Sequence, residues 1–356
     1  MRHVDVVLPY LFPPYIGGTE TVLRKWDAYF GSHKLADLKV RFVLPFAYHG
    51  SNVFNHRGDY IFGWRLFDNK LMRVFGVINL LVYLIFTKAD NLVVLSPNYI
   101  RLSYRIRKIF HKHYRITDWI HFSLDQKFVD NQADFKLADY HLAISTGIKQ
   151  QLLDMGISDK KILTVFNPIE ATTEQIVDSN HPKYIYVGRL EYRGQKNLQE
   201  LLHGFFLVRK ELPEAQLEFW GSGPDILRLH ELVHQLQLDS CVSFRGWHTD
   251  PWSEISAATA FVLTSTYEGL PMSILEAMSH GLPVVAANVA TGPMDEVTFE
   301  NGLLYEPGDL DELKDKMIEV SVNRKNYQGS SIKTSIKQFY TENYFKNLLK
   351  ILQEMG

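Results

Sequence analysis

The chain has 356 residues, which is long enough for two domains of roughly 150 to 200 residues with separate cores. Hydrophobic residues make up 46% and charged residues 22%, a composition typical of globular proteins that excludes the disordered and fibrous classes. The net charge of −2 is unevenly distributed, because residues 1–170 hold 22 Lys and Arg against 15 Asp and Glu, whereas residues 171–356 hold 16 against 25. Since the acidic half would repel a long polyanion, nucleic acid is not an expected partner.

Cysteine use and the first residues indicate the compartment. The single cysteine, Cys241, cannot form an internal disulfide, which suits a reducing compartment. Met1 leads directly into a strand that contains Asp5, so we expect no signal peptide. These features predict a cytoplasmic protein, with peripheral attachment to the inner face of the cytoplasmic membrane as an additional possibility.

The chain begins with a strand over Val4–Leu8, a loop that ends in Gly17 and Gly18, and an amphipathic helix over about Thr21–Phe30. Paired glycines before a helix let the backbone approach a ligand closely, because any Cβ there would collide with it. A plain turn is the alternative. The pattern departs from the dinucleotide fingerprint Gly-x-Gly-x-x-Gly, which argues against a nicotinamide cofactor.

One long apolar run, Leu71 to Thr87, stands out in the first half. It contains Arg73, Gly76 and Asn79 and is shorter than a comfortable membrane span. A buried helix of the first domain is the favoured interpretation. A helix that dips into a membrane is the alternative.

Further short strands alternate with helical stretches, which is typical of a parallel sheet. They cover Lys39–Pro45, Asn91–Ser96, Ile116–His121, Asp139–Ser145 and Leu163–Pro168. His121 falls at a carboxyl end, the edge where open α/β sheets bind ligands, so a ligand contact and a structural role both stay open for it. Residues 171–182 are polar and are interpreted as a linker.

The segment from Arg101 to Arg115 is strongly basic. It holds six Lys and Arg and two His, interleaved with aromatic residues, and no acid interrupts them. A solvated helix face is one interpretation. The other is a surface for anionic membrane lipid or an anionic acceptor.

Five stretches of the second half read as strands with helices between them: Tyr184–Leu190, Leu217–Gly223, Val242–Trp247, Ala260–Thr264 and Pro283–Ala287. Consecutive βα units imply right-handed crossovers and one doubly wound sheet. Gly223 and Trp247 lie just past strand ends, where they could hold a nucleotide base or serve packing alone.

Two cations bracket the first loop of the second half. Arg189 lies at the carboxyl end of its strand, and Lys196 lies at the start of the following helix. Two cations beside a helix N-terminus can clamp a diphosphate without a metal ion. As solvated surface charges they would need no function.

The stretch from Thr264 to Glu276 predicts an anion site. Pro271 suits the first turn of a helix, whose unpaired N–H groups point toward the carboxyl end of the preceding strand. Glu268 and Glu276 flank this site, and carboxylates accept hydrogen bonds from the hydroxyls of a ligand. The alternative is that Glu276 is solvated and Glu268 only complements the helix dipole.

Asp309-Leu-Asp311 resembles a metal-binding Asp-x-Asp, but it follows Pro307-Gly308 and opens a helix, so N-capping explains it better. No His or Cys cluster has metal-ligand spacing, so we expect no essential metal. The segment from about Lys333 to Met355 predicts one terminal helix with an apolar side that docks on the first domain or at the seam.

Gly188-Arg189, Lys196-Asn197, Gly221-Ser-Gly223 and the Glu268 to Glu276 stretch occur in a characteristic order. Through them the second half resembles the retaining family-4 (group 1) glycosyltransferases of the GT-B fold. The additional motifs Gly194-Gln195-Lys196, Gly246-Trp247, Pro251-Trp252 and Thr291-Gly-Pro293 make it most similar to the bacterial lipopolysaccharide-core α-galactosyltransferases and related UDP-hexose enzymes. The first half matches only through Gly17-Gly18 and the strand that ends at His121.

This resemblance implies an α/β fold with two Rossmann-like, doubly wound domains that face each other across a cleft. The expected domains are 1–170 for the acceptor, 171–335 for the nucleotide sugar, and 336–356 as a helix that returns to the seam or to the first domain. A UDP-sugar would be the donor substrate, with no further cofactor required.

The resemblance also implies a role for each matching residue. Arg189 and Lys196 would hold the donor diphosphate, Glu276 the ribose and Glu268 the sugar hydroxyls. The backbone of Gly269, Leu270 and Pro271 would contact phosphate and sugar, Trp247 and Gly223 would border the base, Gly17 and Gly18 would cover the phosphate, and His121 would lie near the reaction centre. The catalytic set is therefore His121, Glu268, Arg189 and Lys196.

The resulting hypothesis is a metal-independent, retaining hexosyltransferase that uses a UDP-hexose, with galactose favoured over glucose and N-acetylglucosamine. The acceptor would be a cell-envelope glycan, a glycolipid or a glycoprotein. A UDP-sugar epimerase or hydrolase on the same fold is one rival, although only His121 offers itself as an acid or base in the first half. A non-catalytic protein that binds nucleotide sugars or a lipid surface is the other rival.

Overall fold

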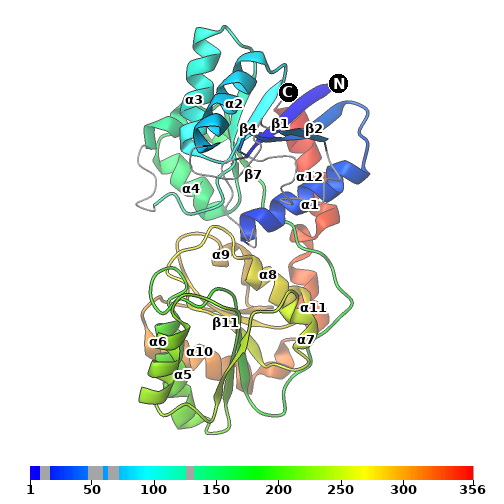
Figure 1. The fold of residues 1–356 in the computed structure, drawn as a ribbon. Coiled ribbons are helices and arrows are strands. Elements are labelled where there is room, and N and C mark those ends of the chain that lie inside the picture. Colours follow the sequence, from blue (N-terminus) through cyan, green and yellow to red (C-terminus); the bar gives the residue numbers. More distant parts are fainter. Residues whose placement is uncertain (9–16, 47–58, 63–71, 126–131, 356) are drawn as a thin grey trace. The chain divides into compact units, whose positions relative to one another are not determined.

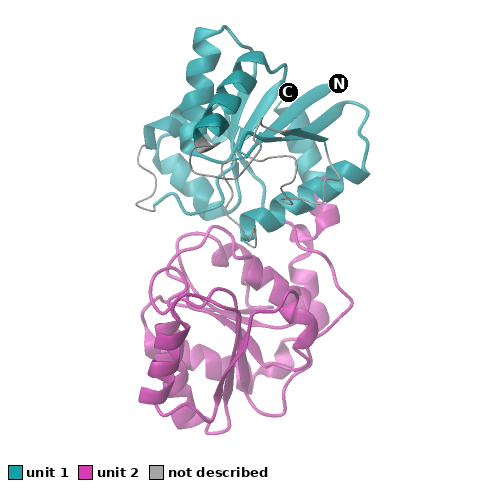
Figure 2. Ribbon diagram, in the orientation of Figure 1, with its two compact units in different colours: residues 1–166, 346–356 teal, residues 167–345 magenta. Residues whose placement is uncertain are grey.

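The structure, a computed structural model, describes residues 1–8, 17–46, 59–62, 72–125 and 132–355. The chain divides into two compact units (Figure 2). Met1–Phe166 and Lys346–Gly356 form the first unit, and Asn167–Phe345 form the second. The chain enters the second unit at Asn167, so the segment 171–182, which was interpreted as a linker, lies wholly within the second unit.

A parallel sheet forms the centre of the first unit (Figure 1). Its order is β3-β2-β1-β4-β5-β6-β7, with β1 Arg2–Val7, β2 Leu38–Leu44, β3 Asp59–Phe62, β4 Asn91–Val94, β5 Arg115–Asp118, β6 Tyr140–Ala143 and β7 Ile162–Thr164. All of these except β3 were expected. β3 has only four residues, which is too short for a recognisable pattern.

The helices of this unit are α1 Gly18–Ser32, α2 Met72–Phe86, α3 Pro97–Ile109 and α4 Thr146–Asp154. The chain passes from β1 through α1 to β2 in one direction and from β3 through α2 to β4 in the other, so the winding reverses between β1 and β4. With right-handed crossovers, α1 and α2 then cover opposite faces of the sheet. Ligands of open α/β sheets bind at such a reversal.

The second unit has its own parallel sheet, in the order β10-β9-β8-β11-β12-β13. Its strands are β8 Lys183–Val187, β9 Gln216–Trp220, β10 Val242–Gly246, β11 Ala260–Leu263, β12 Val284–Ala287 and β13 Gly302–Tyr305, the last of which was not expected. Cys241 lies one position before β10 and is buried. The winding of this sheet reverses between β8 and β11, as expected for a doubly wound fold.

The helices of the second unit connect these strands. They are α5 Leu198–Glu211, α6 Ile226–Gln235, α7 Pro251–Glu254, α8 Met272–Ser279, α9 Pro293–Glu296, α10 Leu310–Val322 and α11 Gly329–Ser335. Asp309 caps α10, because its Oδ1 accepts a hydrogen bond of 2.9 Å from the backbone N–H of Glu312. The N-cap interpretation of Asp309 is therefore confirmed.

The expectation of one terminal helix is wrong. The segment forms α11, a 3₁₀ turn at Lys337–Phe339, and α12 Thr341–Glu354. The break at Tyr340 has a tertiary cause, because the backbone N–H of Ile169 donates to Phe339 O and the N–H of Thr341 donates to Ile169 O. This strand-like bridge holds Tyr340 in an extended conformation, and the last residues of α12 then belong to the first unit.

A buried carboxylate anchors α2 to the first sheet. Asp5 in β1 is fully buried, and the Arg41 guanidinium donates to both of its oxygens at 2.6 and 2.7 Å. The hydroxyl of Tyr83 in α2 also donates to Asp5. Burial and the neighbouring Asp5 charge raise the pKa of Tyr83 well above its ordinary value, so the hydroxyl stays a donor.

The apolar run from Leu71 to Thr87 forms α2 as a helix that is buried on one side only. Leu80 and Leu84 are buried toward the sheet, whereas Val74 and Phe86 on the other side are 60% and 74% exposed. The prediction of a buried helix is therefore wrong for the outer face. Among the described residues, no helix has the length and apolar character needed to cross a membrane.

Replacing Arg41 by Leu is expected to lower the free energy of unfolding by about 2 to 4 kcal/mol, because Asp5 stays buried without its main counter-charge. The measurement is urea unfolding followed by circular dichroism. Lys39→Leu, on the same strand, is the matched control: its exposed pair with Asp59 should contribute less than about 1 kcal/mol. Equal losses in both variants would contradict this assignment.

Candidate functional site

The predicted donor site of the second unit lies where the winding of its sheet reverses. The loop of residues 188–197 follows β8, and the loop of residues 264–271 follows β11, which is the neighbour of β8 in the sheet. Because parallel strands end at one edge, both loops emerge together there. The N–H of Thr266 donates to Gln195 O at 2.8 Å, and the Thr266 hydroxyl donates to Gly194 O at 2.9 Å.

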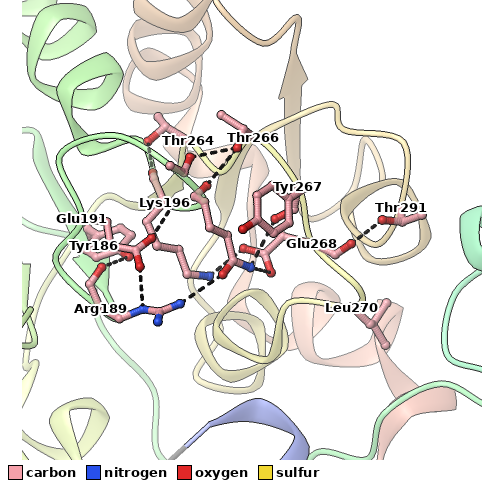
Figure 3. Close-up of polar contacts among 12 residues, drawn as sticks. Tyr186, Arg189, Glu191, Lys196, Thr264, Thr266, Tyr267, Glu268, Leu270 and Thr291 are labelled. Carbon is pink, nitrogen blue, oxygen red and sulfur yellow. Dashed lines mark hydrogen bonds and ion pairs between the residues drawn. The ribbon is translucent and has the colours of Figure 1, made fainter. Parts of the chain in front are cut away.

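An ion pair joins these two loops. Lys196 Nζ lies 2.6 Å from Glu268 Oε1, and both side chains are largely buried (Figure 3). Gln195 Nε2 donates to the other Glu268 oxygen at 3.3 Å. Glu268 therefore has a partner on each oxygen, which holds its carboxylate in one orientation.

Arg189 extends this network toward solvent. Its side chain is exposed, its Nε lies 2.9 Å from Glu191 Oε1, and its Nη2 donates to Gln195 Oε1 at 3.2 Å (Figure 3). Glu191 in turn accepts from the backbone N–H of Lys196 at 3.2 Å. Two cations and two carboxylates thus balance one another here.

Glycines allow the loops after β8 and β9 to pack against each other. A Cβ on Gly221 would lie 1.9 Å from Gly188 O, and a Cβ on Gly223 would lie 2.1 Å from Leu190 O. Gly221 also has φ of +145°, which side chains rarely permit. Close backbone packing therefore accounts for Gly223 whether or not it contacts a nucleotide.

The loop ahead of α8 is held from two sides. Asn167 Nδ2 donates to Leu270 O at 3.3 Å, and the Thr291 hydroxyl donates to Glu268 O (Figure 3). A Cβ on Gly292, whose φ is +95°, would meet Pro271 Cδ at 2.7 Å. Pro271 is the N-cap of α8 rather than part of its first turn, because its ψ of 105° is extended.

Glu276 lies in the second turn of α8. Its Oε2 accepts a hydrogen bond of 3.0 Å from Nε1 of Trp252, which is buried in α7. Glu276 is thus oriented by an indole rather than freely solvated. Trp247 follows β10 and is 54% exposed, so its ring is available to stack on a ligand.

A second buried carboxyl group lies in α9. Glu296 is 1% exposed, and neither of its side-chain oxygens has a hydrogen-bond partner. Burial, together with repulsion from Glu268 and Asp295, raises the pKa of Glu296 well above its ordinary value. This environment favours the protonated, neutral form of Glu296 over its carboxylate.

The candidate residues of the first unit lie near its own reversal point. Gly17 is the N-cap of α1, which begins at Gly18, three residues before the expected start at Thr21. His121 lies three residues beyond the end of β5, although the expected strand reached it. Burial lowers the pKa of His121 to about 3, so its imidazole is neutral. Among the described residues, its Nε2 has no hydrogen-bond partner.

The structure brings Arg189, Lys196 and Glu268 into one network and places Glu276 on the helix that follows. Gly17, Gly18 and His121 belong to the other unit, so their convergence with this network stays a prediction. Gln195, Glu191, Trp252 and Glu296 were not assigned roles from the sequence. Gln195 and Trp252 contact Glu268 and Glu276, which lie far along the chain, so no local spacing signals these two. Glu191 contacts Arg189 and Lys196 within its own loop, where its spacing has no distinctive pattern.

No group of three His, Cys, Asp or Glu side chains that could hold a metal ion occurs in the described part of the chain. The basic groups of the site are Lys196 and Arg189. They could hold an anionic ligand directly, as the sequence suggested. Metal independence itself stays a prediction.

Known proteins resemble both the sequence and the fold. Residues 181–323 match the family description "glycosyl transferases group 1". A lipopolysaccharide 1,6-galactosyltransferase of Salmonella typhimurium is 37% identical over 251 residues, which are 68% of each chain.

Two solved structures extend this comparison. An apo lipopolysaccharide outer core galactosyltransferase, WaaB, superposes with a TM-score of 0.84 at 29% identity and full coverage of both chains. HepE of Anabaena, solved with UDP-glucose, has a TM-score of 0.77 at 17% identity over 99% of this chain and 100% of its own. The latter likeness concerns the fold alone.

Replacing Glu296 by Gln is expected to stabilise the protein increasingly as pH rises. Because its pKa is raised in the folded state, the unfolded chain loses its proton first, and each unit of elevation costs the wild type about 1.4 kcal/mol of stability above the unfolded pKa. The difference in melting temperature between variant and wild type should therefore grow from pH 5 to pH 8. Glu300→Gln, at an exposed position nearby, is the control and should show no such trend.

A constant difference across this pH range would mean that Glu296 is ionised in the folded state. An equally large trend in Glu300→Gln would mean that the trend does not arise from the burial of Glu296.

Proposed function

This chain belongs to the group 1 glycosyltransferases, and on that premise we propose that it transfers a hexose, with galactose preferred, from a UDP-sugar to a hydroxyl of a bacterial cell-envelope glycan. The printed activity of the Salmonella relative, lipopolysaccharide 1,6-galactosyl transfer, supports this choice. Retention of the α configuration and independence of a metal ion are further parts of the proposal. So is peripheral attachment at the inner face of the cytoplasmic membrane.

The observation that carries the proposal is the network of Arg189, Gln195, Lys196 and Glu268 at the reversal point of the second sheet. Ligands of doubly wound sheets bind at this point. We assign the donor diphosphate to Arg189, Lys196 and the N-terminus of α8, where charge-assisted hydrogen bonds and the helix dipole favour an anion. The loop from Gly269 to Pro271 would contact the phosphate and sugar through its backbone.

The two cations and two carboxylates of the network balance one another, which suggests how an anionic ligand binds. In the structure Lys196 is neutralised by Glu268 and Arg189 by Glu191. A diphosphate would take over part of this pairing. Glu268 would then be free to accept hydrogen bonds from sugar hydroxyls while Gln195 keeps its carboxylate in place.

Glu276, oriented by Trp252, is assigned to the ribose hydroxyls, and exposed Trp247 to the uracil. Gly17, Gly18 and His121 would complete the site from the first unit. A neutral His121 can donate or accept one hydrogen bond near the donor sugar but carries no charge toward it.

The chemistry requires little nucleophilic apparatus. UDP departs with its charge stabilised by Arg189, Lys196 and the α8 N-terminus, and each lost contact of this kind costs about 2 to 4 kcal/mol of transition-state stabilisation. The acceptor hydroxyl then attacks the anomeric carbon from the face that UDP leaves, the bond from this carbon to UDP breaks, and the hydroxyl proton passes to the departing phosphate oxygen. Closure of the two units over the substrates would exclude water and suppress donor hydrolysis.

The test is UDP release and product formation with UDP-galactose and a lipopolysaccharide core acceptor that lacks its galactose, beside UDP-glucose, UDP-N-acetylglucosamine and GDP-mannose. Glu268→Gln and Lys196→Met are each expected to lower kcat/KM by about 10²- to 10³-fold, with melting temperatures measured alongside. Arg193→Gln is the matched control, because Arg193 lies in the same loop but donates to Gln199, outside the network. Its turnover should stay within about threefold of wild type.

Wild-type turnover in both site variants would refute the assignment. Isomerised sugar nucleotide without acceptor would favour an epimerase, and UDP binding with no product under any condition would favour a binding protein. Activity that disappears with a chelator and returns with Mg²⁺ would contradict metal independence.

A further inference from the structure

The outer face of α2 is an exposed apolar surface. No charged residue occurs from Val74 to Phe86. The side chains that point away from the sheet are Val74, Phe75, Val77, Ile78, Val82 and Phe86, and each is between 41% and 74% exposed. At 100° per residue, these six positions occupy one half of the helix, and Leu80, Tyr83 and Leu84 lie on the other half.

An apolar hollow of about 500 Å³ borders this helix. Its lining includes Val43, Pro45 and Ile61 from the sheet side and Ile78, Val82 and Phe86 from α2. The hollow lies entirely within the first unit. It enlarges the apolar surface beyond what α2 alone exposes.

A basic hollow of about 560 Å³ adjoins the apolar one, and the two share Thr87 and Lys88. Its cations are Arg2, Lys88, Lys112 and Arg115, and His111 and His113 also line it. Arg2 and Arg115 donate to the backbone carbonyls of Gln353 and Met355, which leaves their charges uncompensated. Among the described residues, none of the four cations forms a salt bridge, and Asp90 is the one acid in the lining.

The salt bridges of α3 and the lining of the basic hollow change which residues form the basic surface that the sequence suggested between Arg101 and Arg115. Within α3, Arg107 pairs with Asp139, and Arg101 lies 3.6 Å from Asp134. These acids lie outside the segment from Arg101 to Arg115, so the segment alone did not indicate the salt bridges. The cations of this run that line the basic hollow, Lys112 and Arg115, lie where α3 ends, beside exposed Ile109 and Phe110.

The basic hollow lies at the opposite edge of the sheet from the expected ligand sites, whereas the apolar hollow extends along β2 and β3 as far as Pro45, just past the end of β2. Arg2 begins β1, Asn91 begins β4 and Arg115 begins β5, so the basic hollow is at the amino edge of these strands. Helices α2 and α3 pack side by side, and both end at this edge (Figure 1). Occupation of the basic hollow therefore leaves the carboxyl ends of β1, β4 and β5 open.

We propose that the outer face of α2 and the basic hollow together form a docking surface for an anionic lipid bilayer. The apolar side chains of α2 would enter the boundary between headgroups and acyl chains, and Arg2, Lys88, Lys112 and Arg115 would contact lipid phosphates. A soluble phosphate would not bind to the apolar face of α2, so it does not account for that part of the surface. Apolar area and uncompensated positive charge side by side fit an anionic membrane surface, where both contribute to binding.

The test is co-sedimentation of the full chain with vesicles of phosphatidylcholine alone or mixed with phosphatidylglycerol, without any sugar nucleotide. Failure of the transferase assignment would therefore not affect the result. We expect binding to the phosphatidylglycerol vesicles that weakens with salt. Lys88→Glu with Lys112→Glu, and separately Ile78→Glu with Phe86→Glu, should each weaken it at least about tenfold, since each basic residue contributes about 1 kcal/mol.

The matched controls are Lys210→Glu and Leu227→Glu, which change an exposed cation and a 75% exposed apolar residue in the second unit. They should bind as wild type does. The changed residues are exposed apart from half-buried Lys112, and circular dichroism would verify that each variant folds.

Three results would overturn the proposal. They are binding by the paired variants that equals the controls, equally strong binding to pure phosphatidylcholine, and displacement from vesicles by inorganic phosphate at an unchanged ionic strength.

Discussion

The ion pair between Lys196 and Glu268 connects the two loops on which the second unit's site depends. It lies where the sheet reverses its winding, so two neighbouring parallel strands deliver their loops to one place. Both side chains are largely buried, and an unpaired charge there would be strongly unfavourable. Gln195 and Arg189 then extend the network outward, which places polar groups in fixed positions before any ligand binds.

Much of the fold could be predicted because the local signals are strong. Buried strands such as β11 and β12 appear as short apolar runs, and Gly188 and Arg189 mark the carboxyl end of β8. Non-local contacts could not be predicted in this way. Lys196 and Glu268 were each recognised, but not that they pair, and the break at Tyr340 depends on a bridge to Ile169.

Non-local contacts also explain why Glu296 and Trp252 were not recognised from the sequence. Glu296 looks in the sequence like any acid in a helix, and its burial near Glu268 depends on how distant segments of the chain pack together. Trp252 has no local sign that it orients Glu276. Helix α2 shows the converse, because its apolar run suggested burial, whereas anchoring of Tyr83 on Asp5 leaves the opposite side open.

A crystal structure with UDP-galactose bound would test the central claim most directly. The account predicts the diphosphate within hydrogen-bonding distance of Arg189, Lys196 and the N-terminus of α8. It further predicts that Glu268 accepts from hydroxyls of the galactose and Glu276 from those of the ribose. A nucleotide bound at another edge of the second sheet, with the Lys196 to Glu268 pair undisturbed and remote from it, would contradict the account.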